Sequence, residues 1–517
     1  MSNLFQKALM VLTFLCAVFA ATTRAQSTAD NSAKLQDIDA VINKALKDWQ
    51  VPGISIAVVQ DGKVIYAKGF GYRDISKQLP VTTDTLFAIG SVSKSFTSLL
   101  FGMLNDEGKV DWDTPVRTYI PEFQLDDPVA NDHATARDLF SHRTGMAPSD
   151  LMWYSSDFTR ADMVHRMRYI KFDSELRRKY EYCNLMIMTM GYLEGRVMNT
   201  SWEELAKKRI LEPLGMTNTN FSVNDSQRAP DFALPYELKK DTIMKVPFKV
   251  IDGIGPAGSI NSSINDMAKY TIFQLGDGTY DGKRLVSEKN LKLVHTGQTA
   301  IGALPPSFTQ GGIGPMVYAM GWVDTNYRGH RMVWHNGGID GFHSLLTMLP
   351  DDKIGVVLLS NLGDDPILEA IAYNVYDRLL GLPAYPWFDK FKELHDKAKK
   401  DRAEAEAKEK QAQVVKTGTQ ASHPLADFAG VYSNPAFGDL TITVKGDALE
   451  AKLNILQAAA LKRVHYDIFE IPEELESPMS GARIQFYMNK DGDIDRVAAP
   501  WNATLPDDVV FTKAAKK

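Results

Sequence analysis

The sequence predicts a mixed α/β (α+β) protein, with one antiparallel sheet flanked by helices, an all-α subdomain, and a small antiparallel β domain after them. Three observations predict this class. Two β-rich hairpin patterns, at 54–74 and 343–361, lie at the ends of a long segment, and the residues from roughly 95 to 250 have mostly helical patterning. A polar stretch then precedes a final β-rich region. Because 517 residues are too many for one ordinary core, about two or three domains are expected.

The N-terminus has the pattern of a secretory signal peptide. Lys7 precedes the apolar run ALMVLTFLCAVFAA, and Thr23 and Ala25 stand at positions −3 and −1 of a cleavage after Ala25. The run is shorter than the roughly 20 residues that span a bilayer. We therefore expect residues 1–25 to be removed and the protein to be exported, either periplasmic or secreted. The run would tether the protein to a membrane only if it stayed uncleaved.

The next segment contains the elements of the predicted sheet. A helix is expected over residues 35–49, where apolar side chains recur at helical spacing. An Asp-Gly dipeptide beginning at Asp61 then separates two β-rich runs, which is a strong hairpin signal. A second hairpin pattern surrounds Pro350, and a helix should follow it over roughly 365–380. Strands so far apart in sequence would share one sheet, so residues 30–387 are predicted to form one domain.

The composition changes over residues 388–423. This stretch includes KFKELHDKAKKDRAEAEAKEKQAQ, which is rich in Ala, Glu and Lys and has almost no apolar face. It predicts either a polar helix or a flexible linker. From 424 to 514 the pattern becomes β, with Gly-containing turns between short runs. A small β-barrel-like domain is expected there.

Composition also excludes several classes of protein. The net charge is −6 and no basic stripe is present, so nucleic-acid binding is not expected. Cys16 and Cys183 are the only cysteines, and cleavage of the signal would leave one, so no internal disulfide is expected in the mature chain. A cysteine-rich metal site is excluded by count, and HExxH does not occur. Neither a metal nor a cofactor is predicted.

The stretch GSVSKSF places Ser91 at the start of a predicted helix and Lys94 one turn later on the same face. A serine hydroxyl is a weak nucleophile until a base takes its proton. A buried lysine can have its pKa lowered to about 7–8 and then act as that base. The alternative is a helix-capping serine beside a solvated lysine, and a Ser-x-x-Lys match alone occurs often by chance.

Two later motifs make the catalytic interpretation more specific. Tyr182 and Asn184 stand at the head of an apolar helical run, and His335-Asn-Gly-Gly338 precedes the second hairpin. A tyrosine could relay a proton here, although a buried tyrosine beside a capping asparagine would explain the same residues. Glycines after a polar residue allow a substrate to lie close along a strand edge.

In this order, Ser-x-x-Lys, Tyr-x-Asn and [Lys/His]-x-Gly resemble the motifs of the serine β-lactamase and penicillin-binding-protein superfamily. The resemblance is to its class-C-like branch, which includes D-amino-acid peptidases, carboxylesterases and β-lactamases. TARDLFSHRTGM, LEPLGMTNT and PAGSINSSINDMAKY also resemble landmarks of that branch. It covers roughly residues 35–385 and implies a β-lactamase/transpeptidase-like fold. The C-terminal region resembles the lipocalin-like domain often appended to these hydrolases.

The resemblance also implies roles. Ser91 would be the acylated nucleophile, Lys94 its general base or a group that tunes it, and Tyr182 the proton donor to the leaving group and activator of the deacylating water. How lysine and tyrosine share the acylation proton stays open. Asn184 would orient Lys94 and the substrate. The implied substrate-binding residues are Asn184, His335, Asn336 and Gly337, and the oxyanion hole would be the backbone N–H groups of Ser91 and Gly338.

Two departures from the family pattern affect the expected activity. The third motif reads His-Asn-Gly rather than Lys-Thr-Gly, and RRKYEYCN lacks the Pro-Gly that precedes the tyrosine in many relatives. A neutral imidazole anchors a substrate carboxylate less well than an ammonium. We therefore expect an exported carboxylesterase or D-amino-acid-peptidase-like hydrolase acting on an ester, amide or β-lactam carbonyl. The alternatives are a class-C-type β-lactamase and a non-catalytic penicillin-binding or cell-wall-binding protein.

The remaining candidates have plainer interpretations. Cys183 is expected to be a small buried residue rather than a nucleophile, which would need an activated thiolate. His343 is expected on a sheet face, and His142 is expected to hold a loop. Trp153 and its neighbour Tyr154 could line the pocket mouth or pack in the core. The C-terminal domain shows no convergent reactive set and is expected to cover or narrow the pocket.

Overall fold

The computed structural model describes residues 31–239, 241–363, 365–412, 415–472, 479–501 and 507–514. The predicted signal peptide at 1–25 lies outside the described residues. Within the described ranges, no helix combines the length and the apolar character needed to cross a membrane.

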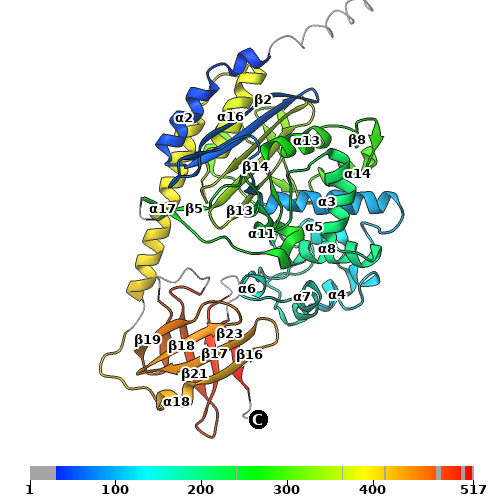
Figure 1. The fold of residues 1–517 in the computed structure, drawn as a ribbon. Coiled ribbons are helices and arrows are strands. Elements are labelled where there is room, and N and C mark those ends of the chain that lie inside the picture. Colours follow the sequence, from blue (N-terminus) through cyan, green and yellow to red (C-terminus); the bar gives the residue numbers. More distant parts are fainter. Residues whose placement is uncertain are drawn as a thin grey trace, which may run out of the picture.

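A nine-stranded antiparallel sheet organises the first domain, as predicted (Figure 1). Its order is β10-β11-β12-β13-β14-β15-β1-β2-β3. Strand β1 pairs with both β2 and β15, so the two predicted hairpins lie side by side although about 300 residues separate them in sequence. The strands are β1 (Gly53–Gln60), β2 (Lys63–Asp74), β3 (Leu79–Pro80), β10 (Thr299–Ala300), β11 (Val317–Tyr318), β12 (Val323–Tyr327), β13 (His330–Ile339), β14 (Phe342–Leu349) and β15 (Ile354–Ser360).

The two faces of the sheet bury different apolar sets. Side chains alternate along β1, so Ile54, Ile56 and Val58 join one core while Ala57 and Val59 join the other. Helices α2 (Ile38–Asp48) and α16 (Ile367–Leu380) cover the first face, and α13 (Ile264–Gln274) packs on the second. These two helices of the first face correspond to those expected at 35–49 and 365–380.

The predicted helical subdomain lies on the side of α13 (Figure 1). The subdomain's central helices are α3 (Ser93–Asp106) and α8 (Asn184–Met198). Shorter helices surround them: η2 (Gly90–Val92), α4 (Pro128–His133), α5 (Ala136–Phe140), α6 (Leu151–Tyr154), α7 (Arg160–Arg166), α9 (Trp202–Ala206) and α12 (Gly255–Gly258). A hairpin that the sequence did not indicate, β5 (Tyr236–Lys239) with β6 (Thr242–Lys245), lies outside it, and Tyr236 joins the core on the face of α2 and α16.

The polar stretch after the first domain is a helix, α17 (Trp387–Ala412), so the helical alternative is the one observed. Its first turns are anchored, because Trp387 and Phe391 are buried against Tyr373 of α16. The helix then runs from the sheet towards the C-terminal domain (Figure 1).

The C-terminal domain is a closed antiparallel barrel in which β16 pairs with β23. It lies beneath α6 and α7 (Figure 1). Among the described residues, three hydrogen bonds join it to this region: the backbone N–H of Ile455 donates to the carbonyl of Ser155 at 3.2 Å, Asn454 Nδ2 donates to Ser155 Oγ at 3.3 Å, and Arg166 Nη1 donates to the carbonyl of Pro435 at 2.8 Å. The strands are β16 (Gly430–Asn434), β17 (Gly438–Lys445), β18 (Ala448–Leu453), β19 (Ala459–His465), β20 (Ile468–Glu470), β21 (Arg483–Met488), β22 (Ile494–Ala499) and β23 (Val509–Lys513).

Candidate active site

Ser91 lies in the short helix η2, immediately before α3. Gly90 just before it has φ +48°, and a Cβ atom there would lie 2.9 Å from the backbone nitrogen of Gly338. The segment is held in place by Ile89, whose N–H donates to the Ile260 carbonyl at 2.9 Å and whose carbonyl accepts from Ser344 Oγ at 2.7 Å. A glycine is therefore needed for the serine turn to approach strand β13 this closely.

The three predicted catalytic side chains meet at the Ser91 hydroxyl. Lys94 Nζ donates to Ser91 Oγ at 2.8 Å, and the Tyr182 hydroxyl donates to the same oxygen at 2.7 Å. Lys94 also donates to the carbonyl of Ala257, at 2.7 Å. Helix η2 supplies the serine and α3 the lysine, while the tyrosine comes from the loop that enters α8, about 90 residues later in the chain. The structure thus places a potential base and a potential acid beside one nucleophile.

Burial sets the protonation of these groups. Lys94 is 0% exposed, and this burial lowers its pKa to about 7, although the Asp150 carboxylate acts in the opposite direction. Burial raises the pKa of Tyr182 well above its ordinary value. Near neutral pH the lysine is therefore the group that can lose its proton, and the tyrosine remains a neutral phenol.

Strand β13 lies directly against the serine. A Cβ atom on Gly337 would lie 2.0 Å from the Ile89 carbonyl oxygen and 2.7 Å from the backbone nitrogen of Ser91, so only glycine permits this approach. The predicted oxyanion-hole residues, Ser91 and Gly338, are in this way brought together where the serine turn contacts the strand. Gly337 is part of the same contact, and its predicted role in substrate binding stays a prediction.

His335 is buried and hydrogen-bonded within the protein, whereas a residue that anchors a substrate would be exposed to the site. It is 4% exposed, and its Nε2 lies 2.8 Å from the Tyr318 hydroxyl. Its Nδ1 is bonded to the carbonyl of Asn336 and must be the donor there, so Nε2 accepts from Tyr318. Burial lowers the pKa of His335 to about 3, and the Lys94 charge adds to this effect. Both ring nitrogens of a neutral imidazole are thus engaged within the protein.

Asn336 and Asn184 depart from the roles that were expected. Because side chains alternate along a strand, Asn336 faces away from the serine and its side chain bonds Glu369 of α16. This placement does not favour contact with a substrate at Ser91. Asn184 begins α8, and its Nδ2 donates to Asp150 Oδ1 at 3.1 Å rather than holding Lys94.

Two further features of the site come from groups that the sequence analysis did not assign to it. Asp150 accepts from Trp153 Nε1 at 2.7 Å and acts electrostatically on Lys94 and Tyr182. The carbonyl oxygen of Ala257 accepts a hydrogen bond from Lys94 Nζ. No sequence motif marks the Ala257 carbonyl or Asp150, because their contacts with the catalytic groups form only when distant parts of the chain fold together. The PAGSI stretch, which contains Ala257, was identified only as a family landmark.

His142 also belongs to this site. Its Nδ1 accepts from the backbone N–H of Cys183 at 3.1 Å, and its ring centroid lies 4.4 Å from that of Tyr182. It therefore positions the tyrosine loop, beyond the loop-holding role expected of it. Cys183 itself is buried, and burial raises the pKa of its thiol to about 12, which leaves it an unreactive packing residue.

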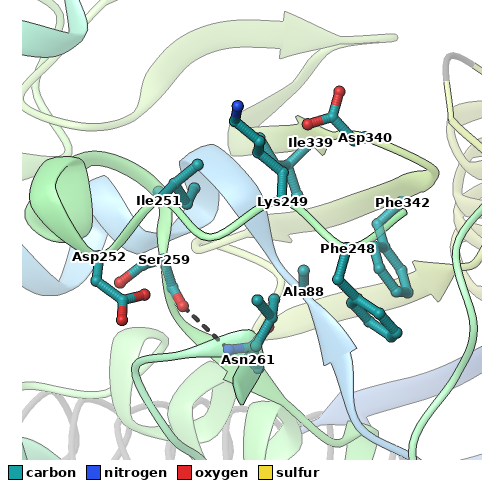
Figure 2. Close-up of a pocket in the computed structure, with 12 residues that line it drawn as sticks. Ala88, Phe248, Lys249, Ile251, Asp252, Ser259, Asn261, Ile339, Asp340 and Phe342 are labelled. Atoms are coloured by element: carbon teal, nitrogen blue, oxygen red, sulfur yellow. Dashed lines mark hydrogen bonds between the residues drawn. The ribbon is translucent and has the colours of Figure 1, made fainter. Parts of the chain in front are cut away.

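A pocket lies beside the serine turn, between the end of β13 and the segment 248–261 (Figure 2). Phe248 and Phe342 pack together there, with ring centroids 6.0 Å apart. At its rim the Tyr154 hydroxyl donates to both carboxylate oxygens of Asp340 at 3.2 Å, and Lys249 Nζ lies 3.7 Å from the Tyr154 ring centroid. Tyr154 therefore contacts two residues that line the pocket, Asp340 and Lys249, while its place at a pocket mouth stays a prediction. Across the ranges that the structure describes, no three His, Cys, Asp or Glu side chains are grouped to hold a metal ion.

Comparisons with known proteins agree with this geometry. The sequence profile of the family described as Beta-lactamase matches residues 38–378, and that of a domain of unknown function, DUF3471, matches residues 415–512. The chain is 27% identical over 512 residues to Unguisins hydrolase ungD' of Aspergillus campestris, covering 92% of this chain and 91% of that protein. It is 30% identical over 457 residues to Unguisins hydrolase ungD of Aspergillus violaceofuscus, covering 82% and 79%.

A solved structure shares the fold. The octameric penicillin-binding protein homologue from Pyrococcus abyssi has a TM-score of 0.60 and 23% identity, covering 93% of this chain and 100% of that chain. At this identity the likeness concerns the fold alone.

Proposed function

The chain belongs to the beta-lactamase family of the serine β-lactamase and penicillin-binding-protein superfamily, and we propose that it is an exported hydrolase that cleaves ester or amide bonds through an acyl-enzyme on Ser91. The observation that carries this proposal is the Ser91 hydroxyl, which accepts hydrogen bonds from both Lys94 and Tyr182. The two relatives that are named as hydrolases support the reaction class.

In the acylation step, neutral Lys94 takes the proton of Ser91 as Oγ attacks the carbonyl carbon. The backbone N–H groups of Ser91 and Gly338 would stabilise the negative charge on the carbonyl oxygen. As the bond to the leaving group breaks, the Tyr182 hydroxyl gives its proton to the departing oxygen or nitrogen, and protonated Lys94 returns a proton to Tyr182. We assign the base to Lys94 because its pKa is lowered to about 7, whereas burial raises that of Tyr182.

Deacylation uses the same groups with water in place of the leaving group. A water molecule loses a proton to the Lys94–Tyr182 pair and attacks the acyl carbon, and Ser91 recovers a proton as it departs. The neutral His335 at the third motif supports a carboxylesterase or a D-amino-acid-peptidase-like enzyme over a class-C-type β-lactamase. The complete Ser–Lys–Tyr arrangement argues against a non-catalytic binding protein.

Intact-protein mass spectrometry during incubation with a penicillin and, separately, with an activated ester tests this proposal. Ser91→Ala should give no adduct and no hydrolysis. Ser98→Ala, on the neighbouring helix α3, should behave as the wild type, because its hydroxyl bonds only the helix carbonyl of Ser95 among the described contacts.

The pattern of adducts separates the alternatives. Ester turnover with little reaction towards the penicillin supports the proposed esterase or peptidase. A penicillin adduct that disappears as hydrolysed drug accumulates would instead identify a β-lactamase, and a lasting adduct a penicillin-binding enzyme. A wild type that forms no adduct and hydrolyses neither compound would contradict the proposal.

A further inference from the structure

Gly338 carries one of the two proposed oxyanion donors, its backbone N–H, on a stretch of β13 that has no side chains at Gly337 and Gly338. A Cβ atom on Gly338 would meet none of the described atoms within 4 Å outside its chain neighbours. A cavity of about 380 Å³ lies beside it and is lined in part by Asn336 and His343. An oxyanion donor stabilises the transition state only if it is held in position before the reaction. Neighbouring residues must therefore fix this part of the strand.

Two neighbouring residues connect this part of the strand to α16. His343 of β14 is the residue directly opposite Gly338, and Asn336 lies two residues before Gly338 on the same face of β13. Both contact Glu369 in the first turn of α16. The Asn336 side chain hydrogen-bonds Glu369, and His343 Nε2 lies 3.9 Å from Glu369 Oε1. One carboxyl group thus joins the two strands at the level of Gly338.

The Glu369 carboxyl is held by buried groups on both sides. Burial raises the pKa of Glu369, and the His343 charge and the Asn336 hydrogen bond act against this increase. Beyond His343, its Nδ1 lies 3.8 Å from Asp365 Oδ1, and Asp365 Oδ2 accepts from Ser360 Oγ of β15 at 2.9 Å. The cluster therefore connects β13, β14 and β15 to the start of α16, on the face of the sheet opposite to Ser91.

We propose that Glu369, together with His343, is a positioning residue for the oxyanion hole, which acts through β13 and keeps the Gly338 N–H where the substrate carbonyl oxygen becomes negative. The inference rests on the proposed acyl-enzyme function and adds to it a group that does not touch the substrate. The oxyanion exists only during the reaction, so a displaced donor weakens binding of the transition state more than binding of the substrate. Loss of Glu369 should therefore lower kcat and leave KM nearly unchanged.

Glu369→Ala, which removes both contacts, tests this inference with 4-nitrophenyl acetate as the substrate. We expect kcat to fall by roughly tenfold, less than the roughly 10²- to 10³-fold typical for complete loss of an oxyanion donor. The affinity for phenylboronic acid, which forms a tetrahedral adduct with a serine oxygen, should fall by a similar factor. Glu369→Gln should recover most of both losses, because its amide oxygen can still accept from Asn336.

Tyr376→Phe is the matched control for a purely structural effect. It removes a buried hydrogen bond between the same helix and the same strand, from Tyr376 Oη to Thr347 Oγ1 at 3.1 Å, four residues beyond His343 on β14. It should lower the stability to urea and leave kcat and the phenylboronic acid affinity unchanged. A folded Glu369→Ala enzyme with the kcat of the wild type, or one that loses no more activity than Tyr376→Phe, would overturn the inference.

Two further outcomes are covered by other measurements. If Glu369→Ala does not fold, Asn336→Ala decides, because it removes only the contact between β13 and Glu369 and leaves His343 paired. That variant should lower kcat by about threefold at unchanged KM, and a kcat equal to that of the wild type would overturn the inference while leaving the serine hydrolase intact. A wild type without Ser91-dependent hydrolysis of the ester would instead remove the proposed function together with the inference.

Discussion

Two buried histidines on neighbouring strands have opposite charge preferences. His335 on β13 is 4% exposed, and burial together with the Lys94 charge lowers its pKa to about 3. His343 on β14 is 8% exposed; burial also acts to lower its pKa, but Asp365 and Glu369 outweigh it and raise the pKa to about 9. Its Nδ1 lies 3.8 Å from Asp365 Oδ1 and its Nε2 lies 3.9 Å from Glu369 Oε1.

The difference teaches that burial alone does not decide the charge of a group in this protein. The sheet separates two environments. On the face with Ser91, His335 lies beside the neutral Tyr318 ring. On the face with α16, His343 lies beside the carboxylates of Asp365 and Glu369. On the catalytic face the absence of a second cation at His335 leaves Lys94 as the group that changes charge near neutral pH. On the opposite face the charges of His343 and its carboxylates are kept away from the site.

The largest test of the catalytic face is Lys94→Met, which keeps the side-chain volume and removes the base. We expect kcat/KM for an activated ester to fall by roughly 10³-fold, because no other group accepts the serine proton as well. Lys109→Met, at an exposed lysine after α3, should have no such effect. A Lys94→Met enzyme within about tenfold of the wild type would contradict the assignment of Lys94 as base.

The pH profile examines the same assignment in the unmodified enzyme. Lys94 must be neutral to accept a proton, so kcat/KM should level off above a pKa of about 7 and fall about tenfold for each pH unit below it. A profile that is flat from pH 5 to 9 would show that the step does not depend on this lysine.

Tyr182→Phe should have a smaller effect, roughly 10²-fold in kcat/KM, because the leaving group loses its proton donor while Lys94 remains. The loss should shrink for esters of strongly acidic phenols, which depart without protonation. Tyr192→Phe, whose hydroxyl bonds Glu122 away from the site, is the control. An equal loss for all leaving groups would show that Tyr182 does not act as their acid.

His343→Gln tests the opposite face through stability. The folded pKa of about 9 lies above the ordinary value of 6.5, so the protonated histidine stabilises the folded state fully below pH 6.5 and progressively less as pH rises through 9. Urea unfolding should therefore show the variant less stable by on the order of 3 kcal/mol at pH 6, with a smaller difference at pH 9.5. His133→Gln, an exposed histidine, is the control. A difference that does not change with pH would contradict the charged state of His343.

Local sequence patterns were sufficient to predict the main strands of the sheet and the catalytic motifs. They could not predict which residues from distant parts of the chain contact one another in the folded protein. The Asp-Gly turn at Asp61 predicted the first hairpin, and the turn at Pro350 between two apolar runs predicted the second. Ser-x-x-Lys with Tyr-x-Asn identified the groups that meet at Ser91. The short strands β10 and β11 have only two residues each and leave no detectable pattern. The Asp150 and Ala257 contacts depend on chain segments that meet only after folding. The orientation of Asn336 could have been deduced from strand alternation once His335 was assigned to the catalytic face.

The smallest expected effect concerns the barrel, which contacts α6 and α7 rather than the catalytic groups. Arg166→Ala removes the hydrogen bond to the Pro435 carbonyl and the packing of the guanidinium 4.0 Å from the Phe158 ring, together worth about 1 kcal/mol. Ser155, whose carbonyl accepts the Ile455 hydrogen bond, directly follows Trp153 and Tyr154 in sequence. A loosened barrel should therefore change kcat/KM for bulky esters by about two- to fivefold and leave kcat/KM for small esters unchanged. Arg168→Ala, whose bonds stay within the helical subdomain, is the matched control. Equal kinetics for large and small esters in Arg166→Ala, and also after removal of the barrel, would show that this domain does not shape the pocket.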